Sequence, residues 1–142
     1  MVIYPGLLRS DFLITNDDEY HAWEVWLWKD VESMVSWSDN YGHGDVGNNA
    51  DACHIPMNLI CDEPMQLIGH LHFVKNKWDM ETVSHELLHG LFIYLKCFVP
   101  DFPRTIYMNW MEDEEPICYE FGYWADWLYR WLWKRNPNEP QN

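Results

Sequence analysis

Two histidines and a glutamate fall within one short motif, Ser-His-Glu-Leu-Leu-His-Gly at 84–90, which contains the pattern H-E-x-x-H. Residues four apart lie on the same face of a helix, so His85 and His89 can direct two imidazole nitrogens at one ion. Glu86 is rotated by about 100° from His85, which places its carboxylate beside the ion rather than on it. That is where a general base for a zinc-bound water should lie, and the motif therefore predicts a catalytic Zn²⁺ site.

The residues around the motif predict the helix that must carry it. Asp79 suits the N-cap, and the helix must stop before Pro100, so we expect it to run from Met80 to about Cys97. Its apolar residues are expected to pack the remaining faces against a core: Val83, Leu87, Leu88, Leu91, Phe92 and Leu95.

A catalytic zinc site needs a third protein ligand. Phe92 stands where a metzincin motif would continue with glycine, so that solution is absent. A carboxylate from a following helix is the other common solution, and residues 112–120 supply several. We expect Asp113 to cap this helix with Pro116 in its first turn, although acidic residues suit a helix N-terminus without any metal. The helix should continue with a core stripe of Trp124, Trp127, Leu128 and Trp131.

Length and composition indicate one domain. The chain has 142 residues, of which 48% are hydrophobic and ten are Trp, enough to form a core over residues 1–135 with a flexible tail at 136–142. Neither a membrane-spanning apolar run nor a signal-peptide pattern is present, so we expect a cytoplasmic protein. The sequence does not define an oligomeric state.

The formal net charge of -14 bears on the partners of the chain. A surface this acidic disfavours direct nucleic-acid binding and anionic membranes, and it favours partners with basic segments. The same charge also keeps an aromatic-rich chain soluble. The four cysteines form no C-x-x-C pair and are expected as buried thiols, with Cys53, His54 and Cys61 as a second candidate metal cluster.

The N-terminal half carries less specific patterns. Val2–Tyr4 and Phe12–Thr15 read as extended pieces, followed by a helix that Asn16 and Glu19 would cap. Its helical stripe reads as core, with a ligand groove as the alternative: Trp23, Trp26, Leu27, Val31, Met34 and Val35. The Gly- and Asn-rich segment 38–53 is either a functional or a mobile loop.

Two strands are expected before the motif, at Ile55–Ile60 and at Gln66–Val74. In the second strand His70 and His72 share one face. They form either a half-exposed polar face or part of a strand beside the metal cleft that offers its edge to an extended substrate. Residues 101–110 are either a flap over that cleft or ordinary packing.

Three segments together carry a family resemblance: the strand at 68–73, the motif at 84–89 and Glu114–Tyr119. They resemble minimal gluzincin-type zinc metallopeptidases, particularly the small HExxH proteins of bacteriophage genomes and, more distantly, the ImmA/IrrE peptidase domain. The similarity covers roughly residues 66–133. It implies an α+β fold with a small sheet packed against the HExxH helix and a following glutamate-bearing helix, here with an N-terminal helix.

The resemblance also implies the remaining site residues. The third ligand would be Glu115, with Glu114 as the rival because a one-residue slip of the helix would exchange their directions. Tyr119, one turn beyond Glu115, would either donate a hydrogen bond to the oxyanion or pack in the core. The same two alternatives apply to Tyr123, one helical turn further along. Pro116-Ile117 replaces the Ala-Asn of the ImmA-type motif, which leaves the substrate open.

We therefore expect a zinc-dependent metallopeptidase that hydrolyses a protein or peptide substrate, with Glu86 as general base. The alternative is an acidic, phage-type interaction protein that blocks a basic host factor and carries a structural or vestigial zinc site. For a phage-encoded chain the location would be the host cytoplasm.

Overall fold

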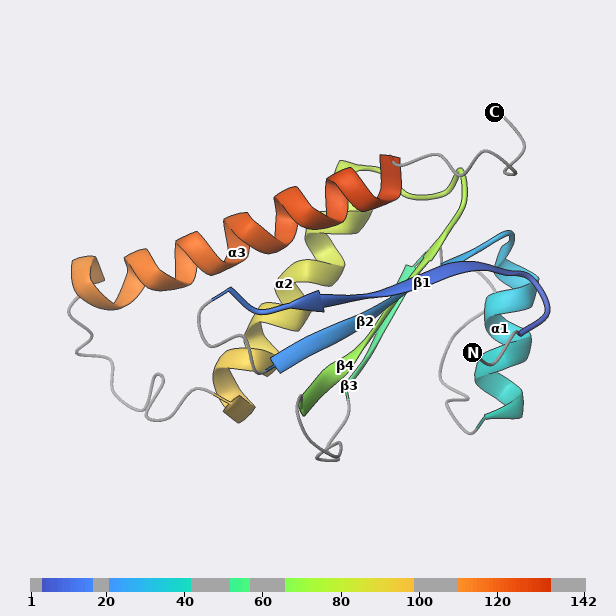
Figure 1. Ribbon diagram of the computed structural model, residues 1–142, viewed down its shortest axis with the longest axis horizontal. Helices are drawn as coiled ribbons and strands as arrows, with labels where there is room; N and C mark the ends of the chain where they lie inside the picture. The colour runs from blue at the N-terminus through green and yellow to red at the C-terminus, as the bar shows by residue number, and fades with distance from the viewer. Residues whose placement is uncertain (1–3, 17–20, 42–51, 57–65, 99–109, 134–142) are drawn as a thin grey trace.

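A computed structural model describes residues 4–16, 21–41, 52–56, 66–98 and 110–133, with the backbone alone at 52–56, 66, 96–98 and 110–114. These residues form seven elements, shown in Figure 1: β1 (Leu7–Ile14), β2 (His21–Trp28), α1 (Val31–Asn40), β3 (Ala52–Pro56), β4 (Gln66–Val74), α2 (Met80–Phe98) and α3 (Trp110–Trp133). The predicted α+β class is confirmed.

The strands form one mixed sheet in the order β1-β2-β4-β3. β1 is antiparallel to β2, β2 is parallel to β4, and β3 is antiparallel to β4. The parallel pair needs a long crossover, which contains α1 and β3. The strand predicted at Gln66–Val74 is confirmed with these bounds. The strand predicted at Ile55–Ile60 overlaps β3, Ala52–Pro56, at its first two residues, and residues 57–60 lie outside the described part of the chain.

The prediction of a helix beginning after Asn16 is wrong over its first half, because His21–Trp28 is a strand. Its residues are nearly all buried, as expected for an inner strand covered on both faces. A continuous apolar run fits a helical stripe by coincidence, and aromatic residues favour strands. The helix begins only at Val31, where Asp30 is the N-cap and accepts a 2.8 Å hydrogen bond from the Ser33 amide.

Alternation along β2 divides the core between the two faces of the sheet. Trp23, Val25 and Leu27 belong to a large cluster with residues of α2 and α3. Trp26 and Trp28 belong to a smaller cluster with Met34 and Trp37 of α1. The Trp residues of this strand are therefore core residues, as the first of the two readings has it.

The helix that carries the H-E-x-x-H motif is predicted closely, since α2 spans Met80–Phe98. The carboxylate of Asp79 accepts a 2.7 Å hydrogen bond from the Thr82 amide, as expected of an N-cap. Four of its predicted core residues are buried: Val83, Leu87, Leu91 and Leu95. The prediction is wrong for Leu88 and Phe92, which are 45% and 60% exposed.

The third helix begins at Trp110, so Pro116 lies in its interior and not in its first turn as predicted. The expected core stripe is buried at Trp124, Leu128 and Trp131 and partly buried at Trp127. A buried Glu120 links α3 to the end of β1. Its carboxylate accepts the Asn16 amide at 2.8 Å and the Trp124 indole N–H at 2.9 Å.

The prediction of a buried thiol is wrong for Cys118, which is a free and exposed cysteine on α3. The side chains of the cluster Cys53, His54 and Cys61 lie outside the described residues, as do most of the loop at 38–53, the segment 101–109 and the tail. Within the part of the chain that the structure describes, no helix is long and apolar enough to cross a membrane.

Two glycine substitutions test how closely α2 packs against the sheet. At Gly90, an added Cβ would lie 2.9 Å from Cζ2 of the buried Trp23 indole, whereas at Gly122 of α3 nothing lies within 4 Å. Gly122→Ala should stabilise the protein by about 0.5–1 kcal/mol through helix propensity. Gly90→Ala should instead lower the free energy of unfolding, because overpacking costs about 1–3 kcal/mol. Urea unfolding measures both, and equal stabilisation by the two would contradict the close approach.

Candidate metal centre

The two motif histidines lie together on the exposed face of α2. Their Nε2 atoms are 3.2 Å apart, and their ring centroids are 4.7 Å apart. Two nitrogens bound to one zinc ion at about 2.0–2.1 Å with a tetrahedral angle are separated by about 3.3–3.4 Å. The separation of the Nε2 atoms of His85 and His89 is therefore close to the one that a shared ion requires.

Glu86 lies at the boundary between the exposed face and the core. Its side chain is 8% exposed, although the adjacent His85 is exposed. The rotation of about 100° between successive residues places Glu86 toward the side of α2 that packs on the sheet. Glu86 thus lies between the histidine face and the buried side of α2.

The remaining predicted site residues lie on the outer face of α3. Glu115 is exposed, and Tyr119 is 74% exposed, so packing in the core does not account for this tyrosine. Among the described residues, no three His, Cys, Asp or Glu side chains lie close enough together to hold an ion. The structure thus brings together two of the three predicted ligands, and Glu115 as the third stays a prediction. The side chain of its rival Glu114 is outside the described residues.

Both readings of the histidines on β4 are wrong. β4 lies between β2 and β3, so neither of its edges is open to an extended substrate. His70 and His72 are buried and face α1, on the opposite side of the sheet from α2, so they form no half-exposed face. The edge strand that packs beside α2 is β3.

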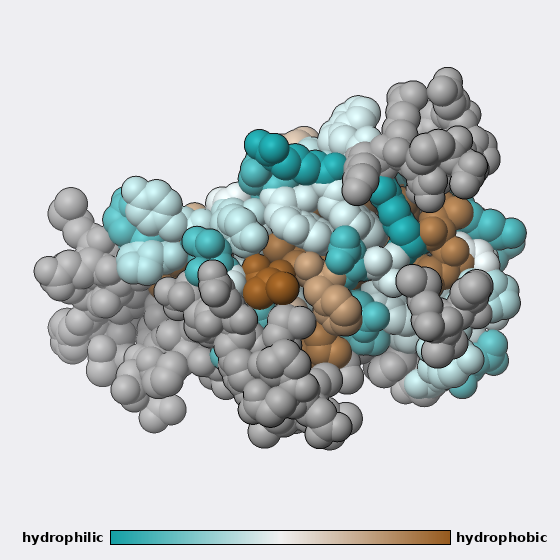
Figure 2. All heavy atoms as spheres, in the orientation of Figure 1, coloured by the Kyte–Doolittle hydropathy of each residue, from teal (hydrophilic) through white to brown (hydrophobic). Residues whose placement is uncertain are grey.

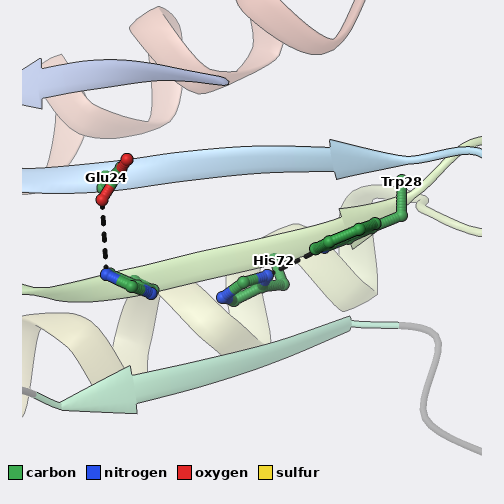
Figure 3. Close-up of polar contacts among 4 residues, drawn as sticks. Glu24, Trp28 and His72 are labelled. Atoms are coloured by element: carbon green, nitrogen blue, oxygen red, sulfur yellow. Dashed lines mark hydrogen bonds and ion pairs between the residues drawn. The ribbon is translucent and has the colours of Figure 1, made fainter. Parts of the chain in front are cut away.

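These two histidines belong to a buried polar cluster that the sequence reasoning missed (Figure 3). The indole N–H of Trp28 donates to Nδ1 of His72 at 2.9 Å, which leaves the ring proton of neutral His72 on Nε2. Nε2 of His70 lies 3.3 Å from the Glu24 carboxylate. The period-two spacing of Glu24, Trp26 and Trp28 would have shown this cluster once 21–28 was read as a strand.

Aromatic rings enclose this polar cluster. His70 stacks on Trp26 with ring centroids 5.2 Å apart, and His72 lies 4.8 Å from Trp37. Burial raises the pKa of the Glu24 carboxyl, and a hydrogen bond from Trp26 partly opposes that shift. The cluster is densely packed and supports α1, so we assign it to the core rather than to catalysis.

The molecular surface also carries exposed apolar side chains. Figure 2 shows hydrophobic residues reaching the surface among hydrophilic ones on one face of the molecule. From Met80 to Leu95 of α2, where side chains are described, the large exposed apolar residues are Met80, Leu88 and Phe92. Two of these, Leu88 and Phe92, share the helix face of the histidine pair.

Comparison of the chain with protein-family models, curated proteins and solved structures found no match.

The half-buried carboxyl of Glu24 makes stability depend on pH. Its raised pKa favours the protonated form in the fold, so this contribution is complete below the unfolded-state pKa and is lost as the pH rises through the folded-state pKa. Glu24→Gln should therefore gain stability relative to the unmodified protein as the pH rises from about 4 to 7. Thermal unfolding across that range measures the difference. A difference that grows toward acid would show that pairing with protonated His70 governs this site instead.

Proposed function

We propose that the protein is a zinc-dependent metallopeptidase whose ion is held by His85 and His89 of α2 and by Glu115 of α3. The observation that carries the proposal is the 3.2 Å separation of the two Nε2 atoms on one exposed helix face. Glu86, which directly follows the first histidine, lies at the edge of the core, and this position adds support.

The chemistry follows from these residue types. Bound zinc would supply a water of pKa about 7 and would polarise the scissile carbonyl. Glu86 takes a proton from the attacking water and transfers it to the leaving amine. The burial of Glu86, which is 8% exposed, restricts the rotamers that its carboxylate can adopt. Tyr119, exposed on α3, is proposed to donate a hydrogen bond to the oxyanion.

The proposed arrangement is the minimal gluzincin type, in which α2 and α3 flank the site and the sheet supports both. Leu87 of α2, Leu128 of α3 and Phe73 of β4 belong to one core cluster, which supports this arrangement. A peptide substrate would lie over the exposed face of α2, where the histidine pair would hold the ion. The acidic charge of the chain favours substrates with basic segments in the cytoplasm, and it disfavours direct contact with nucleic acid or membrane.

The ligand set is tested by metal analysis of purified variants. His85→Ala and His89→Ala should each remove stoichiometric zinc, and zinc should no longer raise their melting temperature, because an ion that binds only the fold stabilises it. Glu32→Ala, on the exposed face of α1, is a control with no expected effect on zinc. Glu115→Ala should weaken zinc affinity by 10-fold or more, and Glu114→Ala far less, because adjacent helical residues face different directions. Full zinc content in both histidine variants would overturn the site.

The role of Glu86 separates an enzyme from an acidic interaction protein. Glu86→Gln keeps the size of the side chain and should retain both zinc and the melting temperature. It should lower peptide hydrolysis by about 10²–10⁴-fold, because positioned acid–base catalysis typically contributes that much. Zinc content, thermal unfolding and hydrolysis of a mixed peptide library are measured on the same preparation. Undiminished biological effect of the variant on its host would favour the blocking function instead.

A further inference from the structure

The exposed face of α2 carries more than the two histidines. Relative to His85, helical geometry places Glu81 at about -40°, Leu88 at about -60° and Phe92 at about -20°, with His89 at about 40°. These five residues occupy a strip about 100° wide, and each one is exposed. Met80 is also exposed but lies about 140° from His85, outside this strip.

The strip is charged at its N-terminal end and apolar at its C-terminal end. A carboxylate, Glu81, lies one turn before His85, whereas Phe92 lies about one turn after His89. Leu88 lies between the two histidines and directly before His89. The two apolar side chains are 45% and 60% exposed on a helix whose other large apolar residues from Val83 to Leu95 are half-buried or buried. Exposed large apolar residues next to polar ones commonly mark a binding surface.

We infer that this strip selects the substrate: a peptide with a basic residue on one side of the scissile bond and a large apolar residue on the other. Glu81 would pair with the basic residue, and the net charge of -14 would add long-range attraction. Leu88 and Phe92 would cover the apolar side chain. This inference rests on the proposed function, because the histidine pair must hold the ion between the two subsites.

The dimensions agree with a short segment. Glu81 and Phe92 are eleven residues apart in α2, which corresponds to about 16 Å along the helix axis. An extended peptide covers that length with about five residues. The substrate class is therefore a basic–apolar pentapeptide segment, and no longer recognition sequence is required by the strip.

The test uses three short peptide hydroxamates, because the hydroxamate binds zinc directly and reports the subsites without turnover. The first carries Arg and Leu on opposite sides of the chelating group, the second has Ser in place of Leu, and the third has Glu in place of Arg. Binding to the zinc-loaded protein should fall about 10-fold for the second compound through lost apolar burial. It should fall about 3-fold for the third, and that difference should shrink at high salt.

Matched variants locate the two subsites. Phe92→Ala and Leu88→Ala should each remove most of the preference for Leu over Ser, whereas Met80→Ala, which is 62% exposed off the strip, should leave it unchanged. Glu81→Gln should remove the preference for Arg over Glu, and Glu32→Gln on α1 should not. All five residues lie at least partly in solvent, so thermal unfolding should be little changed in these variants.

The possible failures are distinguishable. Protein without stoichiometric zinc overturns the proposed function, and the substrate inference falls with it. Zinc-loaded protein that binds all three hydroxamates equally, or in which Met80→Ala acts as strongly as Phe92→Ala, overturns the substrate inference alone.

Discussion

The close approach of α2 to the sheet governs the geometry of the whole candidate site. Gly90 directly follows His89 and lies against the indole of Trp23, where a Cβ would come within 2.9 Å of the ring. Trp23 is fully buried and packs edge-on against Trp124 of α3, so it cannot move to make room. The contact between Gly90 and Trp23 therefore sets the distance of α2 from the sheet. The positions of the histidines and Glu86 depend on that distance, because they lie on the same helix.

The same residue types behave differently on the two sides of the sheet because their surroundings differ. His70 and His72 lie among indole rings, where each finds a polar or aromatic neighbour and supports the packing of α1. His85 and His89 lie on the exposed side of α2, where their Nε2 atoms are 3.2 Å apart. Burial makes the first pair part of the core, and exposure leaves the second pair accessible to an ion and a substrate.

The sequence predicted the elements whose local signals agree, and it failed where they conflict. Asp79, the 3.6-residue period and Pro100 all define α2, and its bounds were predicted within one residue at its C-terminal end. The run 21–28 is apolar on both faces, so periodicity could not separate a buried strand from a helix. The order of strands depends on pairings between distant segments, so local patterns could not show that β4 is an inner strand. Only two of the candidate ligands share a helix, and that local spacing is the part of the site the sequence could define.

Leu88 and Phe92 are exposed because α2 packs on the sheet with one side and presents its histidines on the other. One side of the helix is filled by the contact with the sheet and α3, so the histidine face must point outward to remain accessible. Any residue at helical spacing from His85 and His89 shares that exposure, whatever its polarity. Exposed apolar side chains favour aggregation, and the high net charge opposes it by mutual repulsion between molecules. The high net charge and the exposed apolar residues beside the histidines are thus linked. The charge opposes the aggregation that these apolar side chains would otherwise favour.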